Sequence, residues 1–149
     1  MRMILLAALA VCLASPLHAN EELQQQLSDN TKLCKVAADA NNLADALIFC
    51  GKANAIQSVP VNLVNLGSAL YMHGKCKEAK HNFIDAMNIE PTLAVAHFNL
   101  GRVYEICDQS QAQALEQYEM AQSLGDTTAS AAILEMVPKK LYTEAFPKQ

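Results

Sequence analysis

Basic residues are scarce in this chain of 149 residues, in which 11 lysines and arginines stand against 15 aspartates and glutamates. The formal net charge is −4 with neutral histidines. Binding to nucleic acid needs a basic surface that neutralises phosphates, and this composition does not favour one. We therefore predict no nucleic-acid partner.

The common sequence signatures of catalysis and cofactor binding are also missing. The chain has no glycine-rich phosphate loop, no Cys-x-x-Cys pair and no Gly-x-Ser-x-Gly motif. Only His73 and Cys76 have a spacing that metal ligands use, and a closed zinc site needs four ligands. His81 and His97 have no partner at helical spacing, so we expect solvated or packed helix residues. We predict no catalytic residues, no cofactor and no metal site, and we expect the function to reside in a surface.

The longest apolar run is short and lies near the amino terminus. It covers residues 3–14, follows the single cation Arg2 and precedes a Ser-Pro pair and the small residue Ala19. This order is typical of a secretory signal peptide cleaved after Ala19. The run is shorter than the roughly 20 residues of a membrane-spanning helix, although a membrane anchor remains the alternative. We predict a signal peptide over residues 1–19, no integral membrane span, and a periplasmic or secreted protein.

A repeat of 34 residues organises the middle of the chain. The sequence Asn-Leu-Gly at residues 65–67 recurs 34 positions later at residues 99–101. Downstream, a second pattern of small and aromatic residues recurs after 35 positions, so one residue has been inserted between the halves of the repeat. That pattern is Ala79, Phe83 and Ala86, repeated as Ala114, Tyr118 and Ala121. A period of this length indicates repeated helical hairpins.

The spacing of apolar residues within residues 60–93 resembles the tetratricopeptide repeat (TPR) family. The family pattern has a large residue, then Leu-Gly and a second large residue in the first helix, followed by Ala, an aromatic residue, Ala and Pro in and after the second helix. The matching residues here are, in order, Leu63, Leu66, Gly67, Leu70, Ala79, Phe83, Ala86 and Pro91. Residues 94–128 form a second copy, whose longer connection and Leu-Gly-Asp ending also resemble Sel1-like repeats. Residues 20–59 resemble a degenerate copy with Cys34 at the glycine position.

The resemblance implies an all-α protein, a short right-handed alpha solenoid of about three helical hairpins plus a C-terminal capping helix. The repeat domain is expected over residues 20–137, with the cap at residues 129–137. A tail of mixed charge follows at residues 138–149.

Four cysteines lie beyond the predicted signal peptide, and an even number in an exported chain suggests two disulfides. Three pairings are possible. Cys34 and Cys50 lie eight residues either side of Asn42, and a hairpin that turns there brings them to the same height. Cys76 and Cys107 both lie at the turn ends of adjacent hairpins. We predict the pairs Cys34–Cys50 and Cys76–Cys107, with buried free thiols as the alternative.

In peptide-binding TPR proteins the first helix of each hairpin lines a concave groove, and the asparagine before Leu-Gly bonds to the peptide backbone. The resemblance implies this role for Asn65 and Asn99, whose amides can both donate and accept. The alternative is a surface asparagine bonded to water. We expect the same side to present Ser68, Tyr71, Met72, Val95, Phe98, Arg102 and Ile106, and, if the degenerate hairpin is in register, Lys32 and Lys35. Arg102 suits a ligand carboxylate, whereas Phe98 and Ile106 could instead belong to the core between repeats.

These observations predict a non-enzymatic adaptor that binds a peptide segment or terminus of a protein partner. Exported relatives imply a role in envelope assembly, secretion or maturation. The alternative is a secreted, cysteine-rich Sel1-like protein with a host-directed or hydrolytic role.

Overall fold

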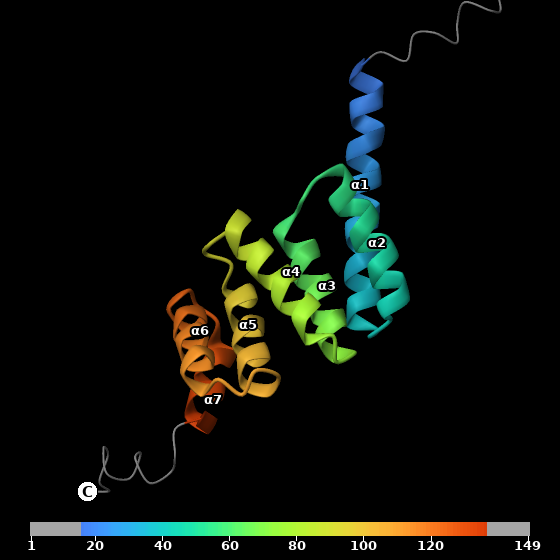
Figure 1. The fold of residues 1–149 in the computed structure, drawn as a ribbon. Helices are drawn as coiled ribbons and strands as arrows, with labels where there is room; N and C mark the ends of the chain where they lie inside the picture. Colours follow the sequence, from blue (N-terminus) through green and yellow to red (C-terminus); the bar gives the residue numbers. More distant parts are fainter. Residues whose placement is uncertain (1–15, 137–149) are drawn as a thin grey trace, which may run out of the picture.

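The structure, a computed structural model, describes residues 16–136. This part of the chain forms seven α-helices and no strand. They are α1 (Pro16–Asp39), α2 (Leu43–Ile56), α3 (Pro60–Met72), α4 (Cys76–Ile89), α5 (Ala94–Ile106), α6 (Gln111–Ser123) and α7 (Thr127–Met136). Figure 1 shows that α1 and α2, α3 and α4, and α5 and α6 form antiparallel pairs, with α7 following α6.

The pairs stack in chain order. The first helices α1, α3 and α5 contact one another in sequence, while α2 contacts α3 and α4 contacts α5. Each hairpin therefore packs only on its neighbours, which is the arrangement of an alpha solenoid. The predicted all-α solenoid is confirmed.

The turn within each of the three hairpins, and the turn between α6 and α7, each contain one residue with positive φ. These residues are Asn41 (φ 54°), Gly74 (72°), Gln109 (52°) and Gly125 (96°). Glycine enters this left-handed region without a Cβ clash, and asparagine tolerates it better than most residues. The turn between α5 and α6 holds residues 107–110, one residue more than the turn at residues 73–75. This extra residue accounts for the change from 34 to 35 in the sequence repeat.

Glycines at equivalent positions let an aromatic ring press against the first helix in two hairpins. A Cβ on Gly67 would lie 2.6 Å from Cε1 of Phe83, and one on Gly101 would lie 2.6 Å from Cε1 of Tyr118. Phe83 and Tyr118 are each 1% exposed, so these rings fill the seams between α3 and α4 and between α5 and α6. The TPR-like spacing therefore serves close helix packing.

The four cysteines lie in two pairs at disulfide distance, in the combination that the sequence predicted. The Sγ atoms of Cys34 and Cys50 are 2.10 Å apart inside the first hairpin, where both residues are fully buried. Those of Cys76 and Cys107 are 2.06 Å apart and join the start of α4 to the end of α5. One pair is therefore internal to a hairpin, whereas the other links two hairpins.

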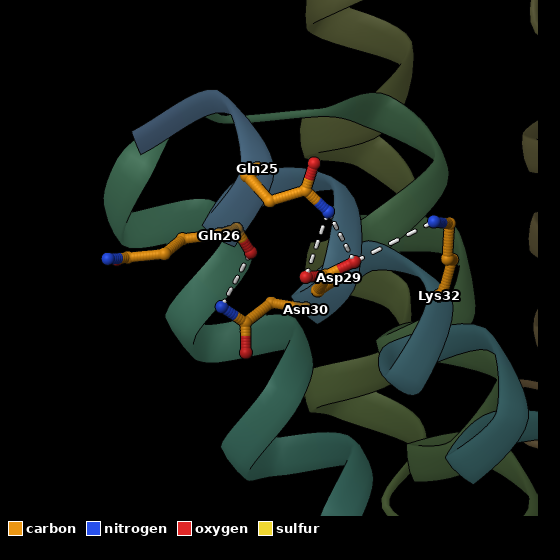
Figure 2. Close-up of polar contacts among 5 residues, drawn as sticks. All are labelled: Gln25, Gln26, Asp29, Asn30 and Lys32. Carbon is orange, nitrogen blue, oxygen red and sulfur yellow. Dashed lines mark hydrogen bonds and ion pairs between the residues drawn. The ribbon is translucent and has the colours of Figure 1, made fainter. Parts of the chain in front are cut away.

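Helix α1 is the longest helix and extends past α2 (Figure 1). Its residues 17–26 are all exposed. Figure 2 shows that its polar side chains bond along the helix: Gln25 Nε2 donates to Asp29, and Lys32 lies 3.7 Å from the same carboxylate. The predicted cleavage point after Ala19 lies in this exposed part, and cleavage stays a prediction.

Residues 1–15 of the predicted signal peptide and the predicted tail at residues 138–149 lie outside the described residues. Between residues 16 and 136, none of the helices combines the length and apolar character needed to cross a membrane.

Candidate functional site

A groove of about 480 Å³ lies along α3, α5 and α7. The first helices α3 and α5 contribute to its lining, together with Tyr118 of the second helix α6 and the predicted cap α7. Its lining consists of Tyr71, Phe98, Arg102, Glu105, Ile106, Tyr118, Thr128, Ala131, Ala132 and Glu135. Tyr71, Phe98 and Arg102 were among the predicted binding residues, and Ile106 was expected on the same side.

Arg102 is the cationic side chain of this groove. Its guanidinium carbon lies 4.9 Å from the centroid of the Tyr71 ring, so a contact between α3 and α5 holds the cation in place. Within residues 16–136 the guanidinium has neither an ion pair with a carboxylate nor a hydrogen bond. Its donors are therefore available to a ligand, and a planar guanidinium suits a carboxylate.

The inner side of the groove combines an aromatic pair with a positioned carboxylate. The Phe98 and Tyr118 ring centroids are 5.5 Å apart, with the rings tilted by 44°. The Tyr118 hydroxyl donates a 2.7 Å hydrogen bond to Oε2 of Glu105. Burial, and then this hydrogen bond, raise the pKa of Tyr118 above its ordinary value. Tyr118 therefore remains a neutral donor that orients Glu105 near Arg102.

Four of the predicted binding residues do not line this groove: Asn65, Ser68, Met72 and Asn99. Met72 is 58% exposed at the end of α3, and Ser68 is half-buried. Neither asparagine side chain hydrogen-bonds to another described residue, and Nδ2 of Asn65 is buried. Their role in peptide binding stays a prediction.

The lysines expected to extend the basic lining are engaged within α1. Lys35 Nζ lies 2.9 Å from Asp39, and Lys32 pairs with Asp29 (Figure 2). All four side chains are more than half exposed, so these pairs are weak. They nevertheless place acidic groups beside both lysines, which reduces the positive charge available to a ligand.

Six lining residues were not among those predicted to bind, namely Glu105, Tyr118, Thr128, Ala131, Ala132 and Glu135. Helical spacing could have indicated Glu105, because it follows Arg102 by three positions on the same face. Tyr118 was expected only as a packing residue. Helix α7 was predicted as a cap, yet it also supplies one wall of the groove.

The histidines serve packing and local bonding. The expectation that His81 has no partner at helical spacing is wrong, because its Nε2 lies 3.3 Å from Oδ2 of Asp85, four positions later on α4. His97 is 7% exposed; its Nε2 lies 2.9 Å from the Pro91 carbonyl, and its Nδ1 lies 2.8 Å from Oε1 of Gln117. His73 Nε2 contacts the Asn41 carbonyl at 3.0 Å, and its sequence neighbour Cys76 lies at bonding distance from Cys107. In the part of the chain that the structure describes, no three His, Cys, Asp or Glu residues gather as metal ligands.

No protein-family model matches the sequence, and no curated protein matches it. Among solved structures, the fold is similar to the crystal structure of MamA, with a TM-score of 0.68 and 23% sequence identity. The match covers 81% of this chain and 74% of the MamA chain. Similarity at this identity shows the fold alone, which is that of an all-α helical-repeat solenoid.

Proposed function

We propose that this chain is a non-enzymatic adaptor that binds a peptide segment or chain terminus of a protein partner in the groove along α3, α5 and α7. One observation carries the proposal. Arg102 is held against Tyr71 beside the rings of Phe98 and Tyr118, and its guanidinium is bonded to no carboxylate of the described residues. A cation that stacks on an aromatic ring and has no carboxylate partner among the described residues suits a ligand with an acidic group and an apolar side chain.

The groove has the form that an extended peptide requires. Its lining comes mainly from α5 and α7, with Tyr71 of α3 at one side and Tyr118 of α6 between them, so a peptide in it would contact several helices of the stack. Phe98 and Ile106 offer apolar surface for a ligand side chain, while Arg102 binds a carboxylate. Asn65 and Asn99 lie on the same helices, α3 and α5, but outside the lining of the groove, so in this proposal they bond to the backbone of the peptide where it extends past the groove along these helices.

The adaptor is proposed to act outside the cytoplasm, in the periplasm or as a secreted protein. Two cysteine pairs at disulfide distance support this location, because disulfides persist mainly in oxidising compartments. The corresponding roles are envelope assembly, secretion or maturation of a partner protein.

A binding experiment with defined peptides tests the proposal. Purified protein is exposed to a library of synthetic eight-residue peptides, each made with a free carboxylate and with an amidated C-terminus. We expect the wild-type protein to retain peptides with a free carboxylate. Arg102→Ala should weaken the binding of these peptides by about tenfold or more, because a hydrogen bond to a charged group contributes roughly 1.5–3 kcal/mol. Lys77→Ala is the matched control, because Lys77 is exposed on α4 and does not line the groove. Equal binding by wild type and Arg102→Ala would contradict the assignment of this groove.

A further inference from the structure

A second cavity of about 520 Å³ adjoins the groove. It is lined by Glu105, Gln109, Gln111, Glu135 and Met136, and it shares Glu105 and Glu135 with the groove. Its lining contains two carboxylates, two side-chain amides and one thioether, and no basic residue. We propose that this cavity takes the lysine or arginine side chain of the same peptide whose acidic group is bound by Arg102. The inference rests on the proposed function and adds the class of ligand that the groove selects.

The two ends of the combined site carry opposite charge. Arg102 and Glu105 are three positions apart on α5, and both line the groove, yet they form no ion pair within the described residues. Glu105 is bonded instead through Oε2 to the Tyr118 hydroxyl. That neutral donor leaves the carboxylate charge uncompensated and its other oxygen available. A ligand that carries both a carboxylate and a cation would complement both ends.

Three elements converge on the cavity and define what fits it. Glu105 comes from α5, Gln109 and Gln111 come from the α5–α6 turn and the start of α6, and Glu135 with Met136 comes from α7. The carboxylates repel anionic groups, and the amide oxygens add acceptors for N–H donors. The thioether of Met136 offers soft apolar contact to an aliphatic stem. A long side chain with a cationic end meets all of these features.

A charge-neutral double variant tests this assignment. Glu105→Gln with Glu135→Gln removes both negative charges, while the glutamine at position 105 keeps an oxygen that can accept from Tyr118. The control is Glu116→Gln with Glu119→Gln, which makes the same change of charge at two exposed α6 residues outside both cavities. The probes are peptides retained from the eight-residue library by the wild-type protein, each resynthesised with its lysine or arginine replaced by glutamine.

We expect the retained peptides to carry a lysine or arginine at a constant distance from the group that Arg102 binds. Replacing that residue by glutamine should weaken binding to the wild type about five- to tenfold, which is the effect of two partly exposed charge pairs. The Glu105→Gln/Glu135→Gln variant should bind both peptide forms equally, whereas the α6 control should keep the preference. Raising the salt concentration should reduce the preference in the wild type.

Two results would overturn the inference. If the wild type binds the lysine and glutamine peptides equally while still depending on Arg102, the second cavity is not part of the site, although the proposed function stands. A preference for the basic peptide that persists in Glu105→Gln/Glu135→Gln would place the basic side chain elsewhere. If the wild type retains no peptide from the library, the proposed function and this inference both fail.

Discussion

Cys34 and Cys50 meet at the place in the first hairpin where Gly67 and Phe83 meet in the second. Both pairs are 16 positions apart, and each cysteine precedes its counterpart by 33 positions. The buried residues around the cysteines are small, namely Ala37, Ala46 and Ala69, whereas the core around Phe83 contains leucines and valines. A covalent link therefore takes the place of a glycine–aromatic contact in the hairpin that buries the least bulky side chains.

The first prediction concerns this link. Cys34→Ala with Cys50→Ala should lower the free energy of unfolding by about 3 kcal/mol, because without the disulfide the loop between these residues, with a sequence separation of 16, is no longer closed in the unfolded chain. Denaturant titration of the oxidised proteins measures the difference. Thiol titration of the native protein, produced under oxidising conditions without residues 1–19, should find no reactive thiol, and reduction should lower its melting temperature by several degrees. Four reactive thiols in the native product would rule out both disulfides.

The second prediction concerns the glycines that face aromatic rings. Gly67→Ala should destabilise the protein by about 1–3 kcal/mol, because the new Cβ would displace the Phe83 ring from a packed seam. Gly51→Ala is the control, because Gly51 lies inside α2 and, apart from its two chain neighbours and the adjacent backbone of α2, nothing lies within 4 Å of the point where its Cβ would be. Alanine should therefore stabilise this helix by up to about 1 kcal/mol. Thermal and denaturant unfolding compare the two. Similar stability for both variants would show that the close packing at Gly67 is not required.

The third prediction concerns alkaline pH. Burial and the bond to Glu105 raise the pKa of Tyr118 above its ordinary value of 10.0, so the unfolded chain releases this proton at a lower pH than the folded chain. The contribution of Tyr118 to the free energy of unfolding is therefore complete below about pH 10 and declines as the pH rises further. Between about pH 9 and 11 the free energy of unfolding of Tyr118→Phe should therefore fall less steeply than that of the wild type.

Lys80 also lowers the free energy of unfolding as the pH rises through this range, because its hydrogen bond to Asp108 raises the pKa of Lys80 in the folded chain. Lys80 is present in both proteins, so the difference between their slopes isolates Tyr118. Parallel slopes over this pH range would contradict the buried, hydrogen-bonded state of the Tyr118 hydroxyl.

The fourth prediction concerns the repeated asparagines. Asn65→Ala with Asn99→Ala should weaken peptide binding about tenfold while leaving the melting temperature nearly unchanged, since neither amide has a hydrogen-bond partner among the described residues. Isothermal titration with a retained peptide and a thermal melt measure the two effects. Asn88→Ala, at an exposed position near the end of α4, is the control. Full-strength binding by the double variant would remove the asparagines from the site.

The hairpins could be predicted from the sequence because their determinants are local or periodic. The Asn-Leu-Gly repeat, the small residues opposite each aromatic ring and the cysteine spacing recur at positions set by helix length and turn length. The Cys34–Cys50 pair followed from the same reasoning, since residues equally far from a turn lie at the same height in a hairpin. The Cys76–Cys107 pair followed from the position of both residues at the turn ends of adjacent hairpins. Tyr71, Phe98 and Arg102 were located by the same periodicity.

The groove itself depended on the tertiary structure. Tyr118 belongs to a second helix, and its hydroxyl reaches Glu105 because Gly101 has no side chain to hold the ring away. Glu135 lines the groove because the turn at Gly125 folds α7 back onto α6, which places Glu135 in the same groove as the lining residues of α5. Periodicity assigns a residue to a face of its own helix. Which faces of two helices meet depends on the angle at which those helices pack, and side-chain packing across the whole stack sets that angle.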